Sequence, residues 1–115
     1  MPTVLTDAIN EKSTKVINAA FTDELGAEVI PVSITWTLTN ESGAIINSRD
    51  GVSITPAVNV NIVLSGLDLA ISAGITSDAE ARILTVEAVY NSTYGSNLPL
   101  KDSVKFYINN LVAIT

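Results

Sequence analysis

Histidine and cysteine, the residues that most often carry acid–base and nucleophilic chemistry, are absent from this 115-residue sequence. A nucleophile would therefore need a serine activated by a lysine, or a pair of carboxylates. No spacing pairs a particular serine with one of the four lysines, which fall at expected strand ends or in solvated segments: Lys12, Lys15, Lys101 and Lys105. The pattern predicts no catalytic residue, and we do not expect an enzyme.

Twelve acidic side chains are scattered along the chain, and most of them stand in expected turns, where a solvated surface charge is the usual role. Calcium is the metal that carboxylates and loop carbonyls suit best. Asp23 with Glu24, or Asp78 with Glu80, could contribute to such a site, but no EF-hand spacing surrounds them. We expect no metal site and no cofactor, and the sequence leaves calcium binding open.

Composition limits the classes of protein and partner. The chain is 47% hydrophobic and 16% charged, which excludes intrinsic disorder. Its net charge of −6 argues against a nucleic-acid partner, which would need clustered Lys and Arg. No basic, apolar leader opens the sequence, and no apolar run approaches the roughly 18 residues of a membrane span. Because cysteine is absent, folding in a reducing cytosol is expected.

Alternation of apolar and polar residues predicts β-strands, because side chains on a strand point to opposite faces of the sheet in turn. The clearest case is 32–39, where Val32, Ile34, Trp36 and Leu38 alternate with Ser and Thr. Further strands are expected at 58–64, 84–90 and 104–108, with shorter candidates at 14–21, 28–30, 44–47 and 52–54. Helix is a weaker alternative for 14–21. Seven to eight short strands separated by turn signals indicate an antiparallel β-sandwich.

Two stretches break the alternation. Residues 66–82 form a long connection in which Ser77 could cap a helical turn, with Glu80 completing a capping box. Residues 90–102 are predicted to be a polar loop, and long loops inside a small domain are often functional or held by a partner. Residues 1–12 are an N-terminal arm or a first edge strand, and 13–115 form the single domain.

Some residues are candidates for contact with a partner. Trp36 is expected in the core, whereas Tyr94 stands amid polar residues and either anchors an interface or covers the end of the sandwich. Tyr107 points away from Phe106 and Ile108, toward a partner or an outer aromatic cluster. The apolar tail contributes Leu111, Val112 and Ile114, which pair along their own sheet or against a neighbour.

Two of these features resemble immunoglobulin-like domains. Trp36 within 34–38 resembles the core Trp of strand C, and 77–81 leading into 83–86 resembles the corner before strand F. The cysteines of strands B and F are missing, and so is the corner tyrosine near Leu84. The resemblance implies an immunoglobulin-like antiparallel β-sandwich of seven to eight strands without a disulfide.

Several short segments are similar to small accessory proteins of tailed-bacteriophage virions. They are 21–26, 31–38, 63–66, 84–90 and 98–102, and together they span about residues 13 to 110. This resemblance implies a non-enzymatic structural role in the virion, as a capsid decoration protein or a component of the neck or tail. Its expected partners are the major capsid, neck or tail proteins, or further copies of itself. The alternative is a cell-surface or carbohydrate-binding immunoglobulin-like adhesion module.

Overall fold

The computed structural model describes residues 3–4, 9–71 and 79–109, and for residues 3 and 4 it describes the backbone alone. In this part of the chain the secondary structure is all β, as the alternation predicted, apart from one short 3-10 helix, η1. The elements in chain order are β1 (Thr3–Val4), β2 (Ile9–Asn10), β3 (Thr14–Ala20), β4 (Ser33–Thr39), β5 (Val52–Ile54), β6 (Asn59–Ser65), η1 (Gly66–Leu69), β7 (Ala79–Ser92) and β8 (Gly95–Asn109).

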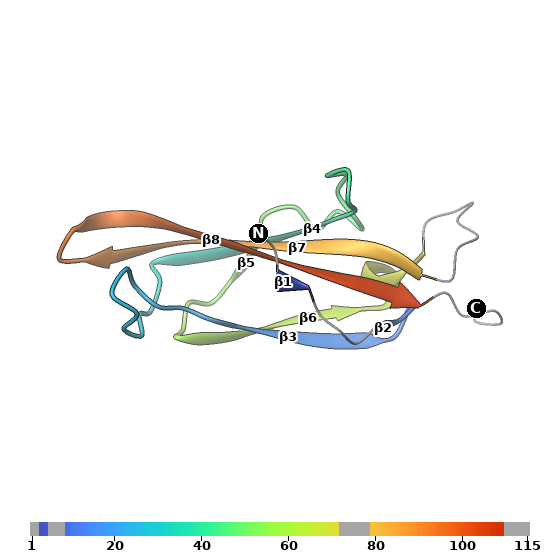
Figure 1. The fold of residues 1–115 in the computed structure, drawn as a ribbon, viewed down its shortest axis with the longest axis horizontal. Coiled ribbons are helices and arrows are strands. Elements are labelled where there is room, and N and C mark those ends of the chain that lie inside the picture. Colours follow the sequence, from blue (N-terminus) through green and yellow to red (C-terminus); the bar gives the residue numbers. More distant parts are fainter. Residues whose placement is uncertain (1–2, 5–8, 72–78, 110–115) are drawn as a thin grey trace.

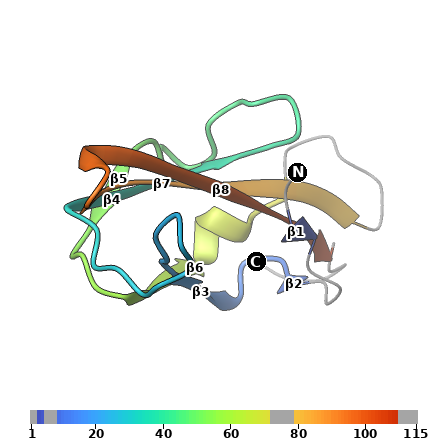
Figure 2. The ribbon, with the colours of Figure 1, turned by 60° about the vertical axis from the view of Figure 1, so that its left-hand side comes forward.

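The strands form two sheets that face each other (Figure 1). The larger sheet has the order β1-β8-β7-β4-β5, with β2 also beside β8, and the smaller sheet is the antiparallel pair β3-β6. Because β1 and β2 run parallel to β8, the larger sheet is mixed and not wholly antiparallel as expected. Figure 2 shows η1 lying between the two layers.

The core lies between the sheets and is built by alternation. Buried and exposed side chains alternate along the whole of β6, and the same parity holds along β4, where Trp36 is only 6% exposed. One cluster of buried residues fills most of the interior, and a smaller one lies around Phe21. The buried members of the larger cluster are Ile9, Ile17, Trp36, Leu38, Ile62, Leu64, Leu69, Leu84, Phe106 and Ile108.

The molecule is elongated, with principal extents of 53 × 25 × 23 Å. Its radius of gyration is 15.5 Å, whereas a compact chain of this length would have about 13 Å. The cause is the hairpin of β7 and β8, whose strands of 14 and 15 residues run the length of the body (Figure 1).

This hairpin corrects two expectations from the sequence. Residues 90–102 are not a loop, because β7 continues to Ser92 and β8 begins at Gly95. Polar residues misled the prediction here, since both strands carry Asn and Ser on an exposed, projecting ribbon. The helical turn at 77–80 is also wrong where it can be examined. Glu80 lies in β7, while Ser77 and Asp78 lie outside the described residues.

The structure also decides three of the shorter strand predictions. Residues 14–20 form β3, so the helical alternative for that stretch is wrong. Residues 28–30 and 44–47 are not strands but hairpin-like loops, each with one isolated bridge, Thr22 to Glu28 and Thr39 to Ile45. Their turn residues bring the chain back before a ladder of hydrogen bonds can develop.

Candidate functional site: the hairpin end

The tip of the β7–β8 hairpin is fixed by side chains of its own residues. The Ser92 hydroxyl accepts a hydrogen bond from the Tyr94 N–H at 3.0 Å and donates one to Glu24 Oε1 at 2.7 Å. The Asn91 side-chain oxygen accepts the N–H of Asn97, which adopts a left-handed backbone with φ of 53°. Asparagine tolerates this conformation better than most residues. The turn therefore has a defined shape that presents Tyr94 outward.

A second loop lies at the same end and is closed in a similar way. Asp23 Oδ1 accepts the N–H groups of Leu25 at 2.9 Å and Ala27 at 3.0 Å, an arrangement in which a carboxylate replaces a backbone acceptor. Gly26 has φ of +81°, a conformation that a side chain would strain. The Glu24–Ser92 hydrogen bond joins this loop to the hairpin tip.

Tyr90 lies beneath these two loops and is 7% exposed. Burial raises the pKa of its phenol, and the nearby charges of Glu24 and Asp23 raise it further. The phenol is therefore neutral across the physiological range, and we assign it a packing role under the loops.

The two joined loops carry four large apolar side chains that are each more than half exposed: Leu25 at 75%, Tyr94 at 71%, Ile30 at 63% and Val32 at 51%. We call these four residues the hairpin-end surface. Exposed apolar side chains on loops of fixed shape are typical of protein contacts, because little conformational entropy is lost when a partner binds. The sequence singled out Tyr94 alone. Leu25 and Ile30 were missed because their exposure depends on where the loops turn. The alternation at 32–39 predicted that Val32 faces the core, and this is wrong, because β4 begins at Ser33 and Val32 is half exposed.

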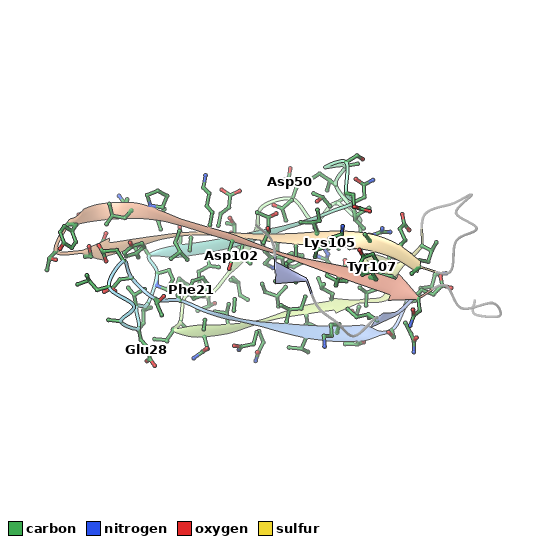
Figure 3. The ribbon with its side chains drawn as sticks, in the orientation of Figure 1. Phe21, Glu28, Asp50, Asp102, Lys105 and Tyr107 are labelled. Atoms are coloured by element: carbon green, nitrogen blue, oxygen red, sulfur yellow. The ribbon has the colours of Figure 1, made fainter. Side chains whose placement is uncertain are left out.

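The remaining predicted contact residues lie elsewhere. Tyr107 is 39% exposed near the far end of β8, about 40 Å along the strand from Gly95 at the usual rise per residue. Lys105 Nζ stands 5.6 Å from the centre of the Tyr107 ring and 2.9 Å from Glu41 Oε2, and this hydrogen bond raises the pKa of Lys105. Figure 3 shows Lys105 and Tyr107 together, away from the hairpin tip. Leu111, Val112 and Ile114 lie outside the described residues.

The core is not uniformly apolar, because Asp68 is buried and only 1% exposed. Asp68 Oδ1 accepts hydrogen bonds from Asn47 Nδ2 at 2.8 Å and Arg49 Nε at 2.7 Å, and Oδ2 accepts the Ser65 N–H at 3.2 Å. Burial alone would raise the pKa of Asp68, but these donors outweigh it and hold the pKa below its usual value. The carboxylate thus ties residues 47–49 to the start of η1.

Arg82 is another buried charge and is also 1% exposed. Its Nη2 donates to the Ala70 carbonyl at 2.7 Å and its Nη1 lies 3.0 Å from Glu80 Oε1, while Nε has no hydrogen-bond partner among the described residues. Arg82 lies two residues before Leu84 and four before Val86, so its side chain points to the same face of β7, toward the core. A charged residue is not expected there, and the sequence analysis therefore did not predict its burial. Asp68 and Arg82 each have an ionic partner, Arg49 and Glu80 respectively.

The described residues do not bring the candidate calcium ligands together in a cluster. Among residues 3–4, 9–71 and 79–109, no group of three or more acidic, His or Cys side chains is arranged to hold a metal ion. The Asp23 carboxylate closes its own turn, Glu80 is paired with Arg82, and Asp78 lies outside the described residues.

Comparison with known proteins identifies no relative and no structural neighbour of the chain. No protein-family model, no curated protein and no solved structure matches the chain. Within the described residues, no helix is long and apolar enough to cross a membrane. The fold and the hairpin-end surface are therefore the features that indicate a function.

Proposed function

We propose that the chain is an immunoglobulin-like β-sandwich and that it serves as a non-enzymatic structural protein. The strand order supports the first part. In immunoglobulin-like domains strands G, F, C and C′ are neighbours in one sheet and B and E in the other. The order β8-β7-β4-β5 and the pair β3-β6 correspond to these strands in sequence order. Trp36 is buried on β4, the strand that corresponds to C.

The protein acts, in this proposal, as a subunit of a tailed-phage virion that docks on a capsid, neck or tail protein. The observation that carries the docking role is the hairpin-end surface, in which four exposed apolar side chains stand on two loops joined by the Ser92–Glu24 hydrogen bond. An aromatic anchor on a rigid, projecting ribbon is a favourable centre for a protein interface. The net charge of −6 keeps the free subunit soluble until it docks.

Quantitative mass spectrometry of purified phage particles tests this proposal. A copy number comparable with the major capsid or tail-tube subunit would indicate decoration of the capsid or tail. A much smaller number would indicate the neck or the tail tip. Complete absence of the chain from particles would overturn the virion role.

Variants at the two exposed tyrosines test the docking surface. Tyr94→Ala is expected to reduce incorporation into particles strongly, because it removes the central aromatic anchor. Tyr107→Ala, the matched control at the far end of β8, should leave incorporation unchanged. Equal effects of the two substitutions would contradict docking through the hairpin end.

A further inference from the structure

A groove of about 300 Å³ opens between the two sheets on the side where β3 and β8 form their edges. Residues 17–22 line one wall, residues 100–104 the other, and Leu84 and Val86 of β7 lie at its base. Figure 3 shows Phe21 and Asp102 on the two facing layers at this place. Seven of the lining residues belong to the two core clusters or pack against them, and polar side chains complete the walls: Asn18, Thr22, Lys101, Asp102 and Ser103.

The β8 edge of the groove is blocked against strand pairing. The carbonyl of Val89 accepts a hydrogen bond from the Val32 N–H, so the peptide groups of Val89 face away from β8. Val89 lies opposite Pro99, and the peptide groups of Pro99 and of the other odd-numbered β8 residues here therefore point outward, away from β7. Pro99 has no N–H to offer, and the Ser103 N–H is taken by the Asp102 carboxylate at 2.8 Å. Lys101 adds a charge. Proline and charges of this kind are how proteins protect sheet edges.

Among the described residues, nothing protects the β3 edge of the groove in this way. The Phe21 N–H donates to the Val58 carbonyl at 3.0 Å, so odd-numbered residues of β3 pair with β6 and even-numbered ones face outward. Asn18 and Ala20 therefore direct their N–H and C=O groups away from β6. Lys15 is the single charged residue in β3 and β6 together. Along residues 17–20 a strand could add to this edge without meeting a proline or a charged side chain of β3.

We propose that this groove receives residues 111–115 of a second copy of the chain, which pair as a strand with the β3 edge. Strand addition of this kind gains affinity from backbone hydrogen bonds and specificity from alternate side chains that enter the groove. The segment Leu-Val-Ala-Ile-Thr is uncharged and rich in β-branched residues, which favour strands. Five extended residues span about 17 Å, which fits within the roughly 20 Å of the six residues 17–22.

The segment must come from another copy. Asn109 lies beside β2, and both β2 and β1 occupy the β8 edge between Asn109 and the groove. The residues that follow Asn109 in the same chain would have to cross these strands. A segment without charged side chains also suits two bodies that each carry −6, because it brings no further negative side chain into the contact.

The contact is head to tail. In Figure 1 the end of β8 and residues 17–22 of β3 lie toward opposite ends of the long axis. An interface between two different surfaces does not close on itself in a dimer, and it generates a ring or a linear chain of copies. This self-association goes beyond docking on a virion and does not depend on it.

Sedimentation velocity of the full chain over a range of concentrations is the first test. We expect dimers and larger species that grow with concentration, and a monomer when residues 111–115 are deleted. A labelled peptide of residues 110–115 should then bind the deletion variant saturably, as measured by fluorescence anisotropy. A peptide in which Val112 and Ile114 are replaced by lysine should not bind.

A pair of proline substitutions locates the contact. Ala20→Pro removes an N–H that points to the open edge and leaves the β3–β6 hydrogen bonds in place. Asn59→Pro is the matched control, because Asn59 lies directly opposite Ala20 and its N–H faces the other edge of the sheet. Ala20→Pro should weaken peptide binding about tenfold, equivalent to about 1.4 kcal/mol, whereas Asn59→Pro should not.

Three results would overturn the proposal: a full chain that stays monomeric at all concentrations, a deletion variant that does not bind the peptide, or equal peptide binding by the two proline variants. The first two measurements need no groove substitution, so they remain decisive if a proline variant fails to fold. Association that persists after deletion of 111–115 would assign self-assembly to another surface and would also overturn it.

Discussion

The two ends of the long axis are organised by opposite means. At the end that holds η1, buried charges fix the loops: Asp68 binds Asn47 and Arg49, and Arg82 binds Glu80. At the hairpin end, exposed hydrogen bonds such as Ser92 to Glu24 fix two loops that leave apolar side chains in water. A buried charge pair is costly to break, whereas an exposed hydrogen bond is not. We therefore expect stability to depend on the first end and binding on the second.

The largest effect is expected at Arg82. Arg82→Ala leaves the mostly buried Glu80 carboxylate and the Ala70 carbonyl without this donor and opens a cavity, so the free energy of unfolding should fall by about 3–5 kcal/mol. Urea unfolding followed by circular dichroism measures this loss. The control is Lys101→Ala, which removes an exposed ion pair: the Lys101 side chain is 66% exposed, and its Nζ lies 3.8 Å from Glu87 Oε2. A loss at Arg82 no larger than at Lys101 would contradict a structural role for the buried charge.

Asp68→Asn comes second. The substitution keeps the size of the side chain but places an amide N–H₂ against donors from Asn47, Arg49 or Ser65 and removes the charge, so we expect a loss of about 2 kcal/mol. The loss is smaller than at Arg82 because Arg49, with 41% of its side chain exposed, can turn to water. An unchanged unfolding midpoint would show that the carboxylate does not hold this end together.

The effect of Asp68 should depend on pH in a defined direction. Its pKa is lower in the folded chain than the 3.8 of an unperturbed group, so its stabilising contribution is complete above that value and disappears as pH falls through the folded pKa. The difference in unfolding free energy between wild type and Asp68→Asn should therefore be full at neutral pH and shrink as the solution is acidified. A difference that stays constant down to strongly acidic pH would contradict this linkage.

Ser92→Ala tests the hairpin end and should have a small effect. It removes the hydroxyl that joins Tyr94 to Glu24, both at exposed positions, and we expect a loss of about 0.5–1 kcal/mol. Amide hydrogen exchange should report faster opening at residues 92–95 and unchanged protection in β4. Loss of protection throughout the chain would mean that the tip is coupled to the core.

Tyr94→Ala should have the smallest effect on stability. The ring is 71% exposed, and surface substitutions of this kind usually change the unfolding free energy by less than about 0.5 kcal/mol. Incorporation into particles should nevertheless fall, as proposed above. A large loss of stability would show that Tyr94 packs on the sandwich end, the alternative that the sequence left open.

Sequence patterns predicted the half-buried strands better than the exposed end of the hairpin and the buried charges. Alternation identified β4, β6 and the inner parts of β7 and β8, because a half-buried strand requires it. It failed at 90–102, where the end of the hairpin is largely exposed and Asn and Ser interrupt the pattern. It also failed at Arg82, whose core-facing parity was visible but whose partner, the Ala70 carbonyl, lies in another part of the chain.

The sequence by itself determined the β class, the core position of Trp36 and the absence of histidine and cysteine chemistry, since these follow from composition and from the two-residue period of a strand. Tertiary structure alone decided which edges stay open, which charges are buried and which loops meet. Glu24 and Ser92 are 68 residues apart in the chain yet share a hydrogen bond. The physical reason is that pairing between distant strands depends on how the whole chain packs, and no local pattern encodes it.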